Sequence, residues 1–388
     1  MTKDVDAERT GAKKPISRVV IGWYAERISD PVLRLRFLRA AATGVTAPEW
    51  LPWRRLSPLG YVLPPLLFLL PVCIFLLRNS HATVTSVAMP GPPLVIRDTR
   101  PAEVWLVEQS GGSETYSNGL RVDNRFVTRN HARAYQTFPL KGGPGLPRTR
   151  PAGIVFHTTE SLQPPFEAGQ NRLLKRIGES LLEYVRNKRA YHFVVDRFGR
   201  VYRVVRETDA ANHAGHSVWA DDRSVYLNLN ESFLGVAFEL ATEAGATGNG
   251  MSAAQLRAAG MLVEMLRSRY GIVAGNCVTH GQVSVNPSNM LVGYHVDWAS
   301  SFPFESVGLK DNYAEPLAAV WSSGFAADAA FMRAAGPRLS ASASAAEQTL
   351  EQMAYAAGLS PGAYRKALQK QYRERVREMR RALPQDAE

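Results

Sequence analysis

The most prominent feature of the hydrophobic pattern is one long apolar run in the N-terminal part of the chain. Residues 59–77 form 19 consecutive positions without a charge, enough to cross about 30 Å of hydrocarbon at about 1.5 Å per residue. Pro64, Pro65 and Pro71 would break a soluble helix but are tolerated in a spanning one. A buried core helix and a cleaved signal peptide are the alternatives, but a leader of more than fifty residues is long for a signal peptide. We therefore predict a transmembrane signal anchor at 58–78.

Basic residues on the two sides of this run predict its orientation. The segment before it is rich in cations: Lys13, Lys14, Arg18, Arg27, Arg34, Arg36, Arg39, Arg54 and Arg55. After Arg78, no Lys or Arg follows until Arg97. The positive-inside rule then predicts a cytoplasmic basic segment at 1–57, a single pass through the inner membrane, and a C-terminal bulk in the periplasm or cell-wall space. Residues 28–41 mix Leu and Arg at helical spacing, which suits either an inner-surface helix or a short solvated one.

Beyond the run, short apolar stretches alternate with helical patterns. Residues 79–150 predict a linker and a small β-containing lead-in. Residues 151–318 predict the main domain, because strand-like runs at 153–157 and 234–240 are separated by a helical stripe within 172–187 and a hairpin at 190–205. Ser252 and Gln255 form a capping box before another helix. The fold class is therefore α/β, a mixed β-sheet flanked by helices.

The last part of the chain, 319–388, is alanine-rich and predicts a helical basic tail. It ends in a helix at 364–383 whose charges lie nearly all round. A solvated helix is the plain interpretation of that pattern, and an arm that binds the cell wall or a partner is the alternative.

The chain has a formal net charge of +11 and only two cysteines. Cys73 lies within the apolar run and Cys277 has no soluble partner, so no disulfide framework is predicted. The charge favours an anionic partner such as nucleic acid, lipid headgroups or an acidic wall polymer. Because the basic residues flank the apolar run and fill the tail, we predict no nucleic-acid binding.

Histidines are the candidate functional residues, because six of the eight lie between His157 and His295. His157 ends the predicted strand 153–157, and His280 opens a predicted strand near 279–283. Strand ends can meet at one edge of a sheet, and a hydrolytic Zn²⁺ site needs three protein ligands and one open position. Either histidine alone would more often be a core or surface residue; together they predict a zinc site.

Five segments of this region resemble the type-2 N-acetylmuramoyl-L-alanine amidases, the superfamily that includes the peptidoglycan recognition proteins. They are IVFHTTES, AYHFVVDRFGRVYRVV, NHAGHSVW, LGVAFEL and THGQV, all within about 151–300. The resemblance implies an amidase that hydrolyses the bond between N-acetylmuramic acid and L-alanine in peptidoglycan or muropeptides. It implies Zn²⁺ ligands at His157 and His280.

The same resemblance implies roles for other residues. Tyr191 would stabilise the oxyanion, and Glu239 would act as general base or orient the water. His213 would line the substrate groove. The hydrolytic members have a basic residue where this chain has Asn286 or Asn289, and Asn289 is predicted to bind substrate. Each has a plain alternative: Tyr191 could be hairpin packing, and Glu239 lies two residues later in its strand than the family's glutamate. His192 alternates away from Tyr191 and is predicted to be core.

The third zinc ligand departs from the family pattern, which has Asp or Cys about eight to ten residues after the second histidine. Ungapped alignment puts Ser288 there, and alignment on the later glycine puts Leu291 there; neither is a good ligand. His295 is therefore predicted as the third ligand, with Asp297 as its alternative from a rearranged loop. Cys277 is a further alternative, but it would face the other way on an extended strand.

Three functions are consistent with this departure from the family pattern. The first is zinc-dependent hydrolysis in cell-wall turnover. The second is a membrane-anchored module that binds peptidoglycan without cutting it. A different amide substrate on the same fold is the third possibility.

Overall fold

The computed structural model describes residues 101–242 and 250–382, which belong to one compact unit, Leu94–Glu388. The predicted segments 1–57 and 58–78, and the linker up to residue 100, lie outside the described residues. Within the described ranges, no helix is both long and apolar enough to cross a bilayer.

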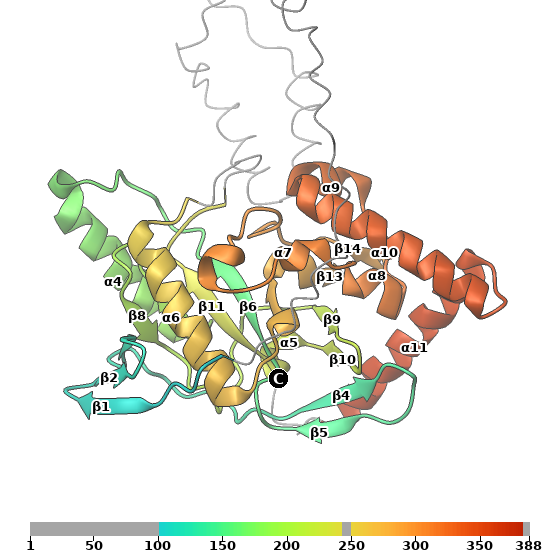
Figure 1. Cartoon of the computed structure of the whole chain (residues 1–388), viewed down its shortest axis with the longest axis horizontal. Coiled ribbons are helices and arrows are strands. Elements are labelled where there is room, and N and C mark those ends of the chain that lie inside the picture. The colour runs from blue at the N-terminus through green and yellow to red at the C-terminus, as the bar shows by residue number, and fades with distance from the viewer. Residues whose placement is uncertain (1–100, 243–249, 383–388) are drawn as a thin grey trace, which may run out of the picture. The chain divides into compact units, whose positions relative to one another are not determined.

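An eight-stranded mixed sheet organises the described fold (Figure 1). Its order is β1-β2-β3-β8-β7-β11-β6-β12. The strands are β1 (Leu106–Ser110), β2 (Ser113–Tyr116), β3 (Arg121–Asp123), β6 (Gly153–Thr158), β7 (Phe193–Val195), β8 (Val201–Arg203), β11 (Phe233–Phe238) and β12 (Cys277–Thr279). β7, β11, β6 and β12 run parallel, and β7 and β8 form the predicted hairpin. The α/β prediction is confirmed.

The centre of the sheet is buried on both faces, which explains its continuous apolar strands. Every residue of β6 and β11 is buried, and the two strands pair with Val236 opposite Phe156. Parallel strands covered on both sides carry such runs because neither face meets water. Alternate side chains therefore point into two separate cores.

Two helices cover opposite faces of this sheet. Helix α6 (Ala253–Tyr270) packs on the face of Ile154 and Phe156, and α4 (Asn171–Lys188) packs on the opposite face over β7 and β8. The predicted capping box of Ser252 and Gln255 is present at the start of α6. The helix predicted at 172–187 is confirmed.

The predicted lead-in does not form a separate body. Strands β1–β3 extend the main sheet through β3 and β8. A second sheet, in the order β5-β4-β10-β9, joins β4 (Tyr135–Pro139) and β5 (Leu146–Arg148) to β9 (Val218–Ala220) and β10 (Ser224–Leu227). Arg133 anchors the connection: it is buried and donates to the carbonyl oxygens of Glu207 and Asp209.

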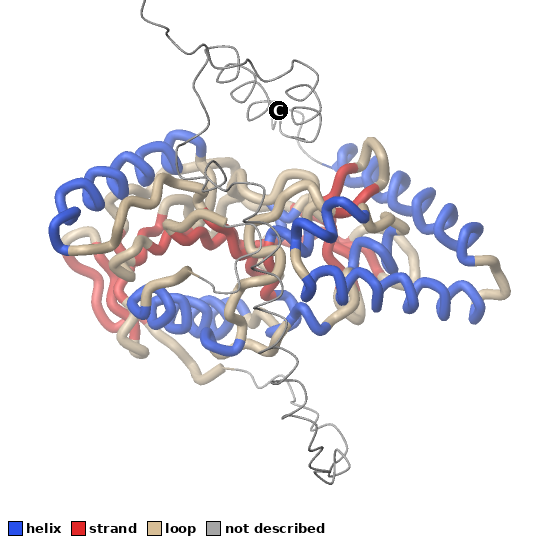
Figure 2. Tube along the Cα trace, turned by 90° about the horizontal axis from the view of Figure 1, so that it is seen from above, coloured by secondary structure: helices blue, strands red, loops and turns tan. Residues whose placement is uncertain are grey.

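The C-terminal helices also belong to this body and are not a free tail. They are α8 (Ala318–Ser323), α9 (Ala329–Ala335), α10 (Pro337–Ala356) and α11 (Pro361–Ala382). Leu350 and Tyr372 share a hydrophobic core with Phe138 of the second sheet and Val155 of the main sheet. The four helices lie at the end of the described fold remote from α4 (Figures 1 and 2).

We expect the replacement Leu350→Ala to destabilise the whole unit, because Leu350 is fully buried. The loss should be about 2–5 kcal/mol in the free energy of unfolding, measured by urea denaturation of the full chain. Leu359→Ala is the matched control: Leu359 is 43% exposed in the turn after α10, and its loss should stay within about 0.5 kcal/mol. Equal effects of the two changes would contradict the packing of α10 into the hydrophobic core of the unit.

Candidate functional site

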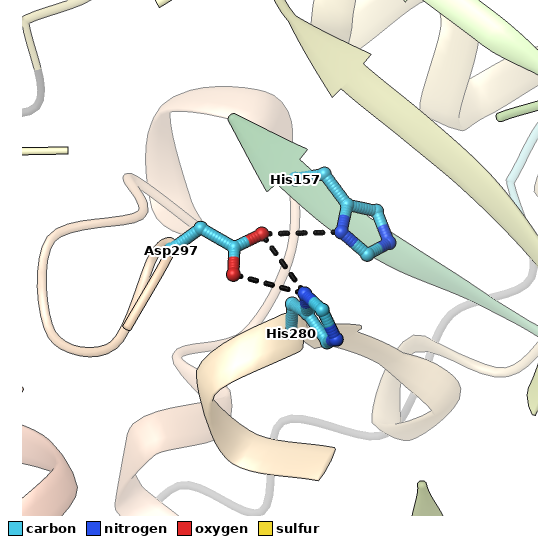
Figure 3. A group of neighbouring side chains, drawn as sticks. All are labelled: His157, His280 and Asp297. Atoms are coloured by element: carbon cyan, nitrogen blue, oxygen red, sulfur yellow. Dashed lines mark hydrogen bonds and ion pairs between the residues drawn. The ribbon is translucent and has the colours of Figure 1, made fainter. Parts of the chain in front are cut away.

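Three side chains from distant parts of the sequence meet at one edge of the main sheet (Figure 3). His157 is near the end of β6. β12 ends at Thr279, and His280 is the first residue of the short helix α7 (His280–Val283). The strand predicted at 279–283 is therefore wrong after Thr279. Because β6 and β12 are parallel neighbours, their carboxyl ends bring both histidines to the same edge.

Asp297 completes the group from the loop after β14 (Leu291–Val292). One of its carboxylate oxygens lies 3.1 Å from Nδ1 of His157 and 3.1 Å from Nδ1 of His280, and the other lies 2.9 Å from Nδ1 of His280. All three side chains are buried. Nε2 of His280 is also buried and has no hydrogen-bond partner among the described residues.

The electrostatics of this group favour neutral imidazole and ionised carboxylate. Burial, and next the nearby His280, lower the pKa of His157 to about 4. Burial alone would raise the pKa of Asp297, but His280 and the hydrogen bonds from both histidines hold it well below its ordinary value. At neutral pH, His157 is therefore uncharged and lies beside the negative charge of Asp297.

This donor set fits a zinc ion. Two imidazole nitrogens and one carboxylate are a combination found in catalytic zinc sites, with the fourth position open. The ligand atoms of the three residues all lie within 4.8 Å of one another. The two Nδ1 atoms are directed at the same carboxylate oxygen, so one ion could contact all three groups without a change of fold.

His213 lies behind His157, away from Asp297. Its Nδ1 is 3.1 Å from Nε2 of His157, and its own Nε2 is 3.3 Å from the carbonyl oxygen of Phe233. Gly235 leaves the space for its ring, since a Cβ there would lie 2.6 Å from the His213 Cγ. Only 8% of His213 is exposed. It therefore contacts His157, where the sequence predicted a groove-lining residue.

Tyr191 lies beside the group. Its ring centroid is 5.1 Å from that of His157. The residue has a positive φ of 52°, an uncommon conformation for a bulky side chain. Burial, and next the charge of Asp297, raise the pKa of its hydroxyl, which therefore stays protonated and able to donate. His192, predicted to be core, is fully buried and accepts a hydrogen bond from the backbone of Gly235.

His295, predicted as the third ligand, lies outside the three-residue group. Its ring stacks on that of His280, with centroids 4.2 Å apart and planes 21° apart. Tyr294 and Val296, its neighbours, are exposed. Asp297, the predicted alternative, belongs to the group.

A hairpin explains why sequence alignment missed Asp297. β13 (Val285–Asn286) pairs with β14, so 17 positions separate His280 from Asp297. Ser288 and Asn289 are exposed in the turn, and Asn289 accepts a hydrogen bond from the backbone of Leu291. No contact joins Asn289 to the three-residue group in the described structure. Cys277 faces the α6 core, as its strand position predicted.

Glu239 follows β11 on the same side as Ala237, which pairs with His157. Its carboxylate accepts a hydrogen bond from the backbone N–H of Arg197 at 3.2 Å and lies under α4, near Gly178. No direct contact with His157, His280 or Asp297 is present. Burial raises the pKa of Glu239 to about 7.

Comparison with known families agrees with this architecture. Residues 147–291 match the family model described as N-acetylmuramoyl-L-alanine amidase, Amidase_2. This segment is a type-2 amidase domain. The match contains His157 and His280 and ends before Asp297. A comparison with curated proteins found no match.

Solved structures similar to the amidase domain are distant. The amidase LysC from Clostridium intestinale is 18% identical, with a TM-score of 0.26, over 47% of this chain and 93% of its own. AmiD from E. coli is 20% identical, with a TM-score of 0.31, over 50% of this chain and 64% of its own. AmpDh3 from Pseudomonas aeruginosa is 20% identical, with a TM-score of 0.30, over 41% of this chain and 58% of its own. At these scores the likenesses add nothing to the family match.

We expect Glu239→Gln to stabilise the protein at high pH. A carboxyl whose pKa rises from 4.5 to about 7 on folding resists ionisation, so its cost to stability is absent below pH 4.5 and complete above pH 7. The variant should therefore match wild type at pH 4.5 and gain up to about 3 kcal/mol at pH 8. Urea unfolding at both pH values measures this; a pH-independent difference would contradict the raised pKa.

Proposed function

We propose that the chain is a zinc-dependent N-acetylmuramoyl-L-alanine amidase acting on peptidoglycan or muropeptides. The observation that carries the proposal is the convergence of His157, His280 and Asp297 in a domain that matches this family. Two buried imidazoles beside an ionised carboxylate supply the protein ligands of a hydrolytic zinc site.

Each site residue would have a separate role in the reaction. Zinc bound in such a set supplies Lewis-acid chemistry for amide hydrolysis. The three ligands fix its position, and the Tyr191 hydroxyl, which stays protonated, can donate a hydrogen bond to a developing oxyanion. Glu239, with its raised pKa, is the proposed proton carrier, and reaching the substrate would require its side chain to leave the Arg197 backbone.

We further propose that the protein is held in the inner membrane by residues 58–78, with the amidase domain outside the cytoplasm. The uncharged run and the excess of cations before it support this placement.

A second candidate function is peptidoglycan binding without cleavage. Ala237 favours it, because this residue stands beside His157 where the family's glutamate is expected two positions before Glu239. A site that holds the metal but lacks a carboxylate at that place would bind substrate better than it cuts it.

Replacement of any ligand should abolish both metal and activity. We expect about one zinc per wild-type chain by mass spectrometry, and none in His157→Ala, His280→Ala or Asp297→Ala. Release of stem peptide from muropeptides should fall about 10³-fold, equivalent to about 4 kcal/mol of transition-state stabilisation. His295→Ala is the matched control and should keep its zinc.

Zinc-loaded wild type that binds muropeptides and releases no peptide would support the binding function instead. Zinc retained by Asp297→Ala and lost from His295→Ala would contradict the proposed ligand set.

We expect His213 to orient His157 by accepting a hydrogen bond from its Nε2–H. His213→Asn can place its amide oxygen near the Nδ1 position as an acceptor, whereas the longer side chain of His213→Gln places its amide near the Nε2 position, away from His157. Chelator competition should therefore show near-normal zinc affinity in the Asn variant and a loss of about 10–100-fold in the Gln variant. Equal zinc affinities in the two variants would show that His213 packs against His157 without orienting it.

A further inference from the structure

Helix α11 is fixed to the fold by one face only. Leu368, Tyr372 and Arg375 are buried on that face, and Arg375 donates to the carbonyl oxygen of Pro139 in β4. Glu378 accepts a hydrogen bond from the backbone of Gly145. The second sheet and α8 thus hold the helix in a set orientation, and its other face points to solvent.

That outer face carries a continuous row of cations. Six basic residues of α11 are exposed: Lys366, Lys370, Arg373, Arg377, Arg380 and Arg381. At 3.6 residues per turn they fall within an arc of about 100° opposite the buried residues, and at 1.5 Å per residue they span about 22 Å. We call these six residues the cationic face.

The cationic face is nearly unneutralised. Lys370 lies 4.0 Å from Glu374, and none of the other five makes an ion pair within the described residues. The spacing creates repeated like-charge neighbours three or four positions apart, such as Lys366 with Lys370 and Arg373 with Arg377. Each such pair disfavours the helix by about 0.2–0.5 kcal/mol. A surface that only served solubility would mix both signs.

We propose that the cationic face binds the carboxylates of polymeric peptidoglycan and holds the enzyme on its substrate. The inference rests on the proposed function for its choice of polymer. The arc contains no aromatic side chain on which nucleic-acid bases could stack, and no large apolar side chain that could enter a bilayer. The cationic face is a row of positive charges. Such a row suits a polymer that carries negative charges at intervals along its length.

Sedimentation of the full chain with insoluble peptidoglycan, in neutral detergent, tests this surface. The variant replaces Lys366, Lys370, Arg373, Arg377 and Arg380 by Gln. The matched control replaces five scattered exposed cations by Gln: Arg121, Arg129, Arg148, Arg257 and Arg333. Both variants lose the same net charge, but only the first loses the cationic face.

At 50 mM salt we expect the dissociation constant to rise about tenfold or more in the first variant and little in the control. Wild-type binding should weaken at 300 mM salt and on peptidoglycan whose carboxylates have been amidated. Cleavage of a soluble muropeptide should be unchanged in both variants, so a failure of the proposed catalysis would show itself separately in the wild type.

Equal binding by the two variants, or binding that survives amidation, would overturn the inference. Preferential binding of wild type to duplex DNA or to phosphatidylglycerol nanodiscs would overturn it too, by assigning the face to nucleic acid or to a membrane.

Discussion

The convergence of two imidazoles on one buried carboxylate is the interaction on which the site depends. It exists because β6 and β12 are parallel neighbours, so His157 and His280 reach the same edge of the sheet although they are far apart in sequence. Asp297 then lies within 3.1 Å of both Nδ1 atoms. Burial makes any charge without a partner costly here, which favours a neutral His157 ring beside an ionised Asp297 carboxylate.

The surroundings limit how this group can move. His213 is close to the far nitrogen of His157, and its own ring fits only because position 235 is glycine. The ring of Tyr191 lies against another side of His157, and the backbone of Tyr191 has a strained, positive φ. Contacts of this kind fix the orientation of the His157 ring. In metalloproteins, such fixed orientation raises the affinity for the metal and the reactivity of the site. Tyr294 and Val296, the chain neighbours of His295, are exposed.

Much of the sheet and two of the three residues of the buried group could be predicted from sequence, because the buried strand 153–157 is a continuous apolar run that ends in histidine. The Ser252 capping box and the hairpin of β7 and β8 were equally local signals. Asp297 could be named only as an alternative, because the β13–β14 hairpin lengthens the spacing beyond the family pattern. The burial of His213 and the docking of α10 and α11 depend on long-range packing, and sequence periodicity does not encode which surface a helix covers.

The location of a bound ion tests the central claim most directly. Anomalous diffraction from crystals grown with zinc should show one peak within about 2.0–2.2 Å of Nδ1 of His157, Nδ1 of His280 and a carboxylate oxygen of Asp297. A peak held instead by Nε2 of His280 or by His295, or no peak near Asp297, would contradict the account.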